Sequence, residues 1–227
     1  MIKQNILLTV DNVIFSVINN KLQVILIKRL VEPFIDCRAI PGWFVLDDEE
    51  LDTAAYRELE EETNVKDVYL EQLYTVWTVD RDPRGRVVTI AYMAVVARQN
   101  ITIKAWSDAS EVKFFPIEKL PKVAFDHKEI LDYAYLRLKY KLWYTNVAQY
   151  FLPSKFKLSD LQNVYEIVYW QKFDTRNFRK KIEKLDIVEE TWEMEIWVKH
   201  RPWMLYRFKN KDLIISNVMN WNYNNTK

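Results

Sequence analysis

Acidic side chains gather in the stretch "DDEELDTAAYRELEEETNV", residues 47 to 65, where Arg57 is the one basic residue. Glu58, Glu61 and Glu62 follow that arginine closely. On a helix, in which each residue advances ~100°, the three carboxylates share one face. Like charges so close repel each other unless a cation lies among them, and hard carboxylate oxygens suit Mg²⁺ or Mn²⁺. The spacing indicates either a divalent-cation site for a phosphorylated ligand or a solvated acidic face.

A second concentration of charge is the polar turn "DRDPRGR", residues 80 to 86. Arg81, Arg84 and Arg86 could hold a diphosphate there through charge-assisted hydrogen bonds. Alternatively, Asp80 and Asp82 satisfy the arginines within the turn. Both interpretations are open at this point.

Three further residues are candidates for the same ligand pocket. Arg29 ends a predicted strand, and Phe125 and His127 lie in "AFDH" at 124 to 127. A lone histidine at such a place is more often structural than catalytic. We therefore expect Phe125 and His127 to line the pocket rather than to do chemistry.

A basic segment near the C-terminus could bind nucleic acid. In the predicted helix "FDTRNFRKKIEKL", Phe178 and Ile182 would face a small core. Arginine and asparagine suit paired contacts with guanine and adenine edges, whereas lysine suits phosphates. The alternative is a solvated basic face. The DNA-binding candidates are Arg176, Asn177, Arg179, Lys180 and Lys181 on the helix, with Lys199 and Arg201 near the turn of a following β-ribbon.

The elements that must position these residues form two groups. Up to residue 150 the pattern predicts an α+β domain. Residues 6–17 alternate apolar and polar, and Asn19-Asn20 predicts a tight hairpin turn before the strand that follows. The further predicted elements are a helix at 51–63, strands at 68–79, 86–98 and 111–117, and a helix at 127–141 capped by Asp126.

After Pro153 the pattern changes to helix, basic helix and β-ribbon, the order of a winged helix-turn-helix. The first helix has Ser159 as its predicted N-cap, and the second has Asp174. Leu161, Val164, Ile167 and Val168 form the apolar stripe of the first helix. We therefore predict domains at 1–150 and 151–227.

Composition fits a foldable cytoplasmic protein. The chain has 227 residues, of which 49% are hydrophobic and 29% charged, and no apolar run approaches the ~20 residues of a membrane span. The single cysteine, Cys37, excludes an internal disulfide and suits a reducing compartment. From residue 151 onward there are 14 basic and 10 acidic residues, whereas acidic residues predominate before it. This asymmetry suggests that the two parts of the chain have different functions.

The acidic helix resembles the Nudix box. Glu49, Arg57-Glu58, Glu61-Glu62 and the entrance "PGWFV" match that family's spacing. The resemblance implies that Glu58, Glu61 and Glu62 bind metal, that Arg57 orients them, and that these four residues are the catalytic set of any hydrolase activity. Trp43 and Asn64 depart from the pattern, because each stands where the box has glycine.

Motifs beyond the box resemble the NrtR-type Nudix-related transcriptional regulators. They include "RDPRGRVVTIAY" at 81–92, "LPSKFKLSDLQNVYE" at 152–166 and "RPWMLYRF" at 201–208. The resemblance implies a Nudix-type α/β/α sandwich joined to a smaller winged helix-turn-helix domain. It further implies a homodimeric repressor of NAD metabolism that binds a double-stranded operator and senses ADP-ribose or a related nucleotide sugar. The alternatives are a Mg²⁺-dependent ADP-ribose pyrophosphatase, or a sugar-responsive regulator with a relic box.

Glycine is scarce and tryptophan abundant. Only Gly42 and Gly85 occur, where average usage of ~7% would give about sixteen, and there are nine tryptophans. Several of them stand where the resembled family has glycine. One hypothesis is that the source organism reads UGA as glycine, which the codons or the mass of the native protein would decide. The alternative is genuine tryptophan in a drifted box. The positions are Trp43, Trp77, Trp106, Trp170, Trp192 and Trp197.

Overall fold

The computed structural model describes residues 5–63, 68–97, 109–194 and 203–210. The chain divides into two compact units, Met1–Leu136 and Arg137–Lys227. Helix α2 (His127–Lys141) contributes residues to both. The domain boundary expected after residue 150 lies beyond this helix and stays a prediction. Within the described residues, no helix has the length and apolar character needed to cross a membrane.

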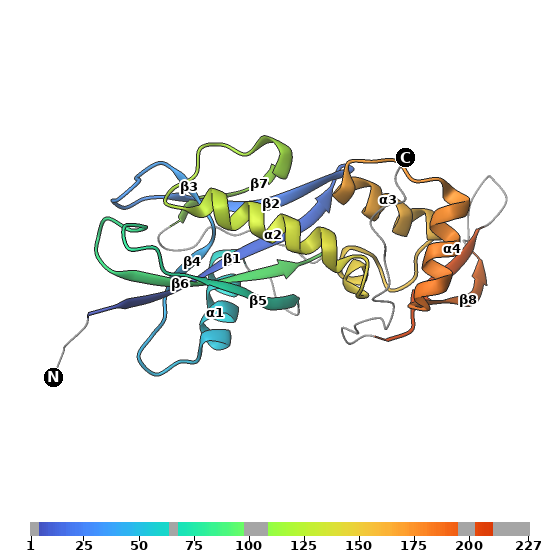
Figure 1. Ribbon diagram of the computed structural model, residues 1–227, viewed down its shortest axis with the longest axis horizontal. Helices are drawn as coiled ribbons and strands as arrows, with labels where there is room; N and C mark the ends of the chain where they lie inside the picture. The colour runs from blue at the N-terminus through green and yellow to red at the C-terminus, as the bar shows by residue number, and fades with distance from the viewer. Residues whose placement is uncertain (1–4, 64–67, 98–108, 195–202, 211–227) are drawn as a thin grey trace. The chain divides into compact units, whose positions relative to one another are not determined.

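One mixed sheet forms the framework of the first unit (Figure 1). Its strand order is β3-β2-β1-β6-β5, with β4 paired to β1 and β7 paired to β2. The central pair β1 and β6 is parallel, and the remaining pairs are antiparallel. The strands are β1 (Leu7–Ile18), β2 (Lys21–Arg29), β3 (Arg38–Ala39), β4 (Gly42–Phe44), β5 (Tyr69–Val76), β6 (Val87–Val95) and β7 (Ala109–Pro116).

The predicted hairpin is present between β1 and β2. Asn19 and Asn20 form its turn with φ of 51° and 56°. Positive φ at both central residues defines a type I′ turn, and asparagine tolerates that conformation better than most residues. The local sequence therefore determines this turn.

Two helices pack on the sheet. Helix α1 (Leu51–Thr63) buries Ala54 and Ala55 against Val10, Ile90 and Tyr92. In the part of helix α2 that belongs to this unit, Ile130, Leu131 and Ala134 are buried. A short 3₁₀ turn (Ile117–Lys119) links β7 to the segment before α2. The predicted α+β architecture of this unit is confirmed.

The second unit contains two helices and a two-stranded ribbon (Figure 1). After a 3₁₀ turn (Val147–Phe151) come α3 (Leu158–Tyr169), α4 (Thr175–Leu185), β8 (Val188–Met194) and β9 (Met204–Phe208). The predicted stripe of α3 is buried, as are Phe178 and Ile182 of α4. The ribbon is antiparallel. This is the predicted order of a winged helix.

Of the two caps predicted in the second unit, one is wrong and the other is confirmed. Helix α3 begins two residues earlier than expected, so Lys157 rather than Ser159 is the N-cap residue. The Asp160 carboxylate accepts a hydrogen bond from the Lys157 backbone N–H at 3.0 Å, which satisfies an N–H that the helix leaves unpaired. In α4, Asp174 caps as predicted and accepts from the Asn177 N–H at 2.9 Å.

Two tryptophans adopt left-handed backbone. Trp170 follows the last residue of α3 with φ 52° and ψ 35°, the position where helices most often carry glycine. Trp192 has φ 60° where the pairing of β8 with β9 shifts register. The two residues are 56% and 83% exposed. Trp43 and Trp77 have no positive φ, so their backbone conformation does not require glycine. Trp106 and Trp197 lie outside the described residues.

Trp170→Gly and Trp192→Gly are each expected to raise the free energy of unfolding by about 1 kcal/mol, since left-handed backbone is costly for any residue with a Cβ. Urea denaturation of the recombinant protein measures this change. Trp143→Gly is the matched control. Its ring packs among aromatic side chains, and its loss should instead destabilise by about 3 kcal/mol or more. Destabilisation by the first two changes would contradict the assignment of backbone strain to these positions.

Candidate functional site

A pocket in the first unit collects five of the six predicted ligand residues. Arg29, Arg81, Arg84, Phe125 and His127 line it, whereas Arg86 does not. Arg86 is half-buried, and its Nη1 has no hydrogen-bond partner within the described part of the chain. The remaining lining comes from Thr9, Asp11, Ile27, Leu30, Val31, Ile40, Gly42, Trp43, Phe44, Asp82 and Val87.

Gly42 permits β4 to form one wall of this pocket. The strand pairs with β1 so closely that a Cβ at Gly42 would lie 2.1 Å from the Val10 carbonyl oxygen and 2.7 Å from Asp11 Oδ1. No side chain fits at that separation. The glycine is therefore required by close approach, and it brings Trp43 and Phe44 into the pocket lining.

Arg81 is held by carboxylates. Its Nε and Nη2 each donate to Asp126 at 2.8 Å, and Nη2 lies 3.6 Å from Asp11 Oδ2. The Arg81 side chain is only 4% exposed. Asp11 also accepts a hydrogen bond from the Thr89 hydroxyl at 2.8 Å. Because two carboxylates balance its charge, Arg81 organises the pocket floor more than it offers charge to a ligand.

Asp11 is a pocket residue that the sequence reasoning missed. The sequence did contain a signal, since Asp11 is a carboxylate in a strand whose other polar residues are uncharged. A buried charge is tolerated only when it is paired and hydrogen-bonded. The contacts of Asp11 with Thr89 and Arg81 meet that requirement.

Arg84 is paired within its own turn. Its Nε donates to Asp82 Oδ1 at 3.0 Å and its Nη2 to Asp82 Oδ2 at 2.6 Å, and the Asp82 side chain is 2% exposed. The guanidinium also lies 5.2 Å from the ring centroid of Phe44 and 5.6 Å from that of Phe125. This geometry favours the self-paired interpretation of the turn. The partner of Arg84 is Asp82, and Asp80 forms no such ion pair within the described residues.

Arg29 differs from the other pocket arginines because its partners are backbone carbonyls. Its Nε donates to Pro33 O at 2.9 Å and its Nη2 to Val31 O at 3.4 Å. The guanidinium lies 4.8 Å from the centroid of the Phe125 ring. Burial and the charge of Arg84 lower the pKa of Arg29. Within the described residues Arg29 has no carboxylate within 4.0 Å, so it carries the pocket's unmatched positive charge.

His127 is a structural residue in this arrangement. Its Nδ1 accepts a hydrogen bond from the Ile40 N–H at 2.9 Å, which leaves the proton on Nε2, 3.9 Å from Asp11 Oδ1. The ring is buried, and burial lowers the pKa of His127 despite the nearby carboxylate of Asp11. A neutral imidazole therefore connects the segment before β4 to the start of α2.

This imidazole predicts loss of stability in mild acid. The folded-state pKa lies below the unfolded value, so only the unfolded chain takes up a proton at this group as pH falls below about 6.5. Denaturation at pH 7.5 and pH 5.5 should show the wild type losing up to about 1 kcal/mol more than His127→Gln. Burial raises the pKa of Glu58, so protonation of that carboxyl stabilises the folded state of both proteins as the pH falls. The difference in stability between wild type and His127→Gln therefore isolates the contribution of His127. An equal loss in both proteins would contradict the assignment.

Beside the pocket, Arg57 binds several carboxylates of α1 and the preceding loop. It donates to both oxygens of Glu49, at 2.9 and 2.5 Å, to Glu58, and to Glu61 at 3.3 Å. It also donates to the Phe44 carbonyl at 3.4 Å, which ties the cluster to β4. The expected role of Arg57 in orienting Glu58 and Glu61 agrees with these contacts.

Glu58 is short of positive charge. Burial raises the pKa of this carboxyl to about 7 even though Arg57 binds it. Such a carboxylate fits a site that a cation would complete, with Glu58 and Glu61 as donors. The side chain of Glu62 lies outside the described residues, among which no three acidic, histidine or cysteine side chains gather closely enough to hold a metal ion. The three-glutamate site remains a prediction.

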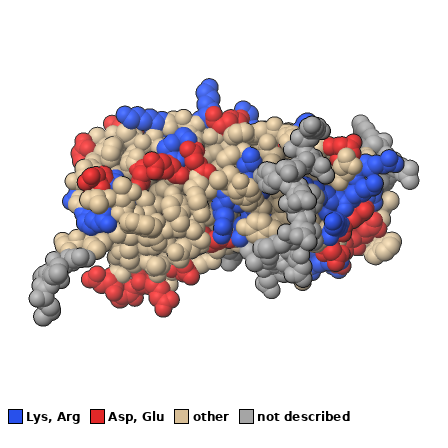
Figure 2. Space-filling model, in the orientation of Figure 1, with Lys and Arg blue, Asp and Glu red and all other residues tan. Residues whose placement is uncertain are grey.

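In the second unit, cations cover the outer face of α4 (Figure 2). Arg176, Asn177 and Lys180 are exposed, and Arg179 is exposed but pairs with Glu183 at 3.0 Å. Lys184, which was not predicted, lies on the same face because it follows Lys180 by four residues. Lys181 points elsewhere: its Nζ lies 3.2 Å from the ring centroid of Trp143. Lys199 and Arg201 lie outside the described residues.

Comparison with known proteins agrees with this two-part organisation. Residues 8–134 match the family model of the NUDIX domain, and residues 148–208 match that of the NrtR DNA-binding winged helix domain. The ADPR responsive transcriptional repressor NtrR of Acinetobacter baylyi is 37% identical over 214 residues, which cover 91% of this chain and 83% of that protein. An ADP-ribose pyrophosphatase of Methanocaldococcus jannaschii is 39% identical over 124 residues, 55% of this chain and 72% of the enzyme.

Shewanella oneidensis NrtR is similar in structure. Its crystal structure with a 27mer DNA has a TM-score of 0.77 and 34% identity, and the match covers 89% of this chain and 93% of that one. Its NUDIX domain in complex with ADP ribose has a TM-score of 0.55 and 37% identity over 60% of this chain and 90% of that one. The fold and these matches define a Nudix domain followed by a winged helix domain. Within that class, the chain belongs to the NrtR family of Nudix-related transcriptional regulators.

Proposed function

We propose that this protein is a DNA-binding transcriptional repressor that ADP-ribose, or a related nucleotide sugar, releases from its operator. The observation that carries the proposal is the pocket charge: Arg81 and Arg84 are matched by aspartates, and Arg29 is left to meet an anionic group. Similarity to an ADPR responsive repressor over 91% of the chain supports the same effector. Genes of NAD metabolism are the proposed targets.

The effector would act by shifting populations. A ligand can shift a conformational equilibrium only as far as its affinities for the two states differ. We propose that binding at Arg29 and the Phe125 ring favours a state in which the winged helix has lower affinity for duplex DNA. By linkage, DNA would then weaken effector binding by the same factor.

A gel shift with a duplex from the region upstream of this protein's own gene tests the proposal. The full chain should bind this duplex, and the complex should dissociate as ADP-ribose is added. Binding that ADP-ribose does not alter, but that a pentose reverses, would favour the sugar-responsive alternative. No binding to the duplex, at any effector concentration, would contradict the repressor function.

Hydrolysis of ADP-ribose is the second candidate function, since Arg57 still binds Glu49, Glu58 and Glu61. Similarity to an ADP-ribose pyrophosphatase supports it. Nudix domains as a class act with divalent cations. Glu58, Glu61 and Glu62 would hold Mg²⁺ or Mn²⁺, which would supply Lewis-acid stabilisation of phosphate charge. Release of AMP from ADP-ribose with Mg²⁺ measures this activity, and Glu61→Gln should abolish it. Unchanged AMP release in the variant would exclude this catalytic set.

Two further features belong to the proposal. We propose a homodimer, because two copies of the winged helix would match a two-fold symmetric operator. We also propose a cytoplasmic location, in line with the single thiol of Cys37. Light scattering of the protein bound to its operator duplex tests the dimer.

A further inference from the structure

Lys181 occupies a different environment from the other cations of α4. Its Nζ lies 3.2 Å from the ring centroid of Trp143, well inside the ~6 Å range of a cation–π contact. The side chain is half-buried. Burial lowers the pKa of Lys181 to about 8, which agrees with an ammonium group withdrawn from bulk water.

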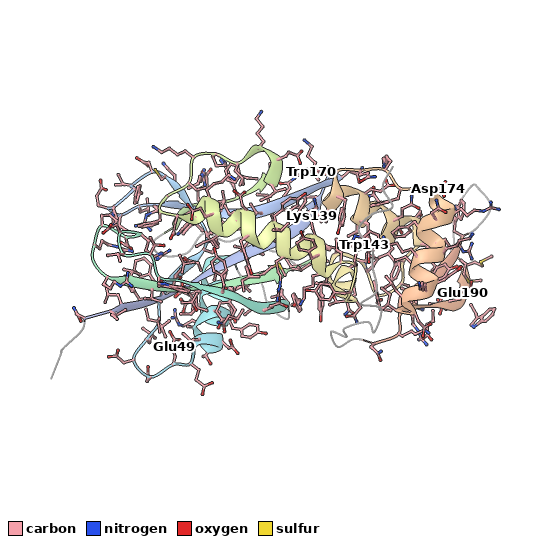
Figure 3. The ribbon with its side chains drawn as sticks, viewed as in Figure 1. Glu49, Lys139, Trp143, Trp170, Asp174 and Glu190 are labelled. Atoms are coloured by element: carbon pink, nitrogen blue, oxygen red, sulfur yellow. The ribbon has the colours of Figure 1, made fainter. Side chains whose placement is uncertain are left out.

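The ring that receives Lys181 is itself fixed in the second unit (Figure 3). Trp143 packs on Tyr165 and Tyr169 of α3, with ring centroids 4.6 and 5.6 Å apart, and on Phe173 at 5.9 Å. The Tyr165 hydroxyl donates to the Leu142 carbonyl at 2.5 Å, next to Trp143 in the chain. Lys181 therefore rests on a rigid aromatic cluster rather than on a mobile surface side chain.

The helical positions separate the two kinds of cation. Arg176, Lys180 and Lys184 recur every four residues on one exposed face and form no ion pair within the described residues. Lys181 lies at the border between that face and the buried residues Phe178 and Leu185. A side chain whose ammonium lies over Trp143 cannot reach a phosphate in the direction in which Lys180 points.

We propose that Lys181 is a positioning residue for DNA binding: its cation–π contact with Trp143 fixes the rotation of α4 about its own axis, so that Arg176, Asn177 and Lys180 face the major groove together. The proposal rests on the DNA-binding function proposed above. It replaces the expectation that Lys181 contacts DNA directly. Loss of the contact should weaken binding without removing a phosphate contact.

Salt dependence separates the two roles. Each phosphate contact contributes about 0.9 to the slope of log K against log salt concentration. Affinity of the full chain for the upstream duplex, measured by fluorescence anisotropy from low to high salt, should fall about fivefold to tenfold in Lys181→Met with the slope unchanged. Lys180→Ala is the matched control and should lower the slope by about one unit. An equal loss of slope in Lys181→Met would overturn the proposal.

A double-mutant cycle tests the pair itself. Lys181→Met should cost little in a Trp143→Leu background, which retains apolar bulk but lacks the aromatic face, and Lys181→Arg should restore affinity because arginine also binds such a face. Additive losses would overturn the proposal. The same cycle, measured by urea denaturation without DNA, tests the contact between Lys181 and Trp143 separately from the DNA-binding function. Absence of DNA binding would contradict the function, whereas absence of coupling in denaturation would contradict the contact.

Discussion

Arg176→Ala is expected to weaken binding to the operator about 5-fold to 150-fold, the loss typical of a side chain that reads a base through two hydrogen bonds. Arg176 lies in the first turn of α4, where recognition helices contact base edges. It is exposed and has no ion pair within the described residues, so its guanidinium is available for a guanine edge. Anisotropy titrations with the upstream duplex measure the loss.

Lys180→Ala provides the contrast on the same helix face. A phosphate contact carries no sequence information, so this variant should lose affinity by a similar factor for the operator and for a scrambled duplex. Arg176→Ala should lose affinity mainly for the operator. If both duplexes respond equally to Arg176→Ala, then Arg176 contacts the backbone and the base contact belongs to another residue.

Arg29→Gln is expected to weaken the affinity for ADP-ribose about 100-fold, because a charge-assisted hydrogen bond in a partly buried site contributes about 3 kcal/mol. Arg29 is the pocket arginine without a carboxylate partner in the described structure. Neither Arg81 nor Arg84 can replace it, since aspartates already balance their charges. Calorimetric titration measures the affinity, and the gel shift should require correspondingly more effector.

Two controls separate charge from loop structure. Lys28→Gln removes the neighbouring cation of β2, which pairs with Asp36 and does not line the pocket, so it should leave effector affinity within about twofold. Arg29→Lys keeps the charge but loses the fork that binds Pro33 and Val31, and it should retain part of the affinity. Unchanged binding in Arg29→Gln would place the anionic group of the effector elsewhere.

Turns and helices that depend on residues close together in the sequence could be predicted. Asn19-Asn20 determines its turn because few residues tolerate positive φ. Helix α1 follows from apolar spacing, and Asp174 begins α4 because its carboxylate accepts a backbone N–H. The Ser159 prediction failed by two positions because Asp160 can satisfy the same helix end from within its first turn. Helix ends are less well determined by sequence than helix interiors.

Features that depend on distant contacts could not be predicted. Charge alone does not reveal that Arg84 pairs with Asp82 while Arg81 crosses to Asp126, 45 residues away. The same limit applies to the contact of Lys181 with Trp143, because only folding brings that ring to the ammonium group. The family resemblance supplied the class of ligand and partner, and the structure supplied the ion-pair and hydrogen-bond partners of individual arginines.

The matched charges of the pocket bear on how its preference could change during evolution. Removing one member of a buried ion pair commonly costs 3–5 kcal/mol, because the other charge is left without a partner. Arg81 and Asp126 form such a pair, so substitution of either residue alone would destabilise the folded protein. A lineage that acquires a new effector should therefore vary at Arg29 and around Phe125 first, and should exchange the aspartate–arginine pairs only together.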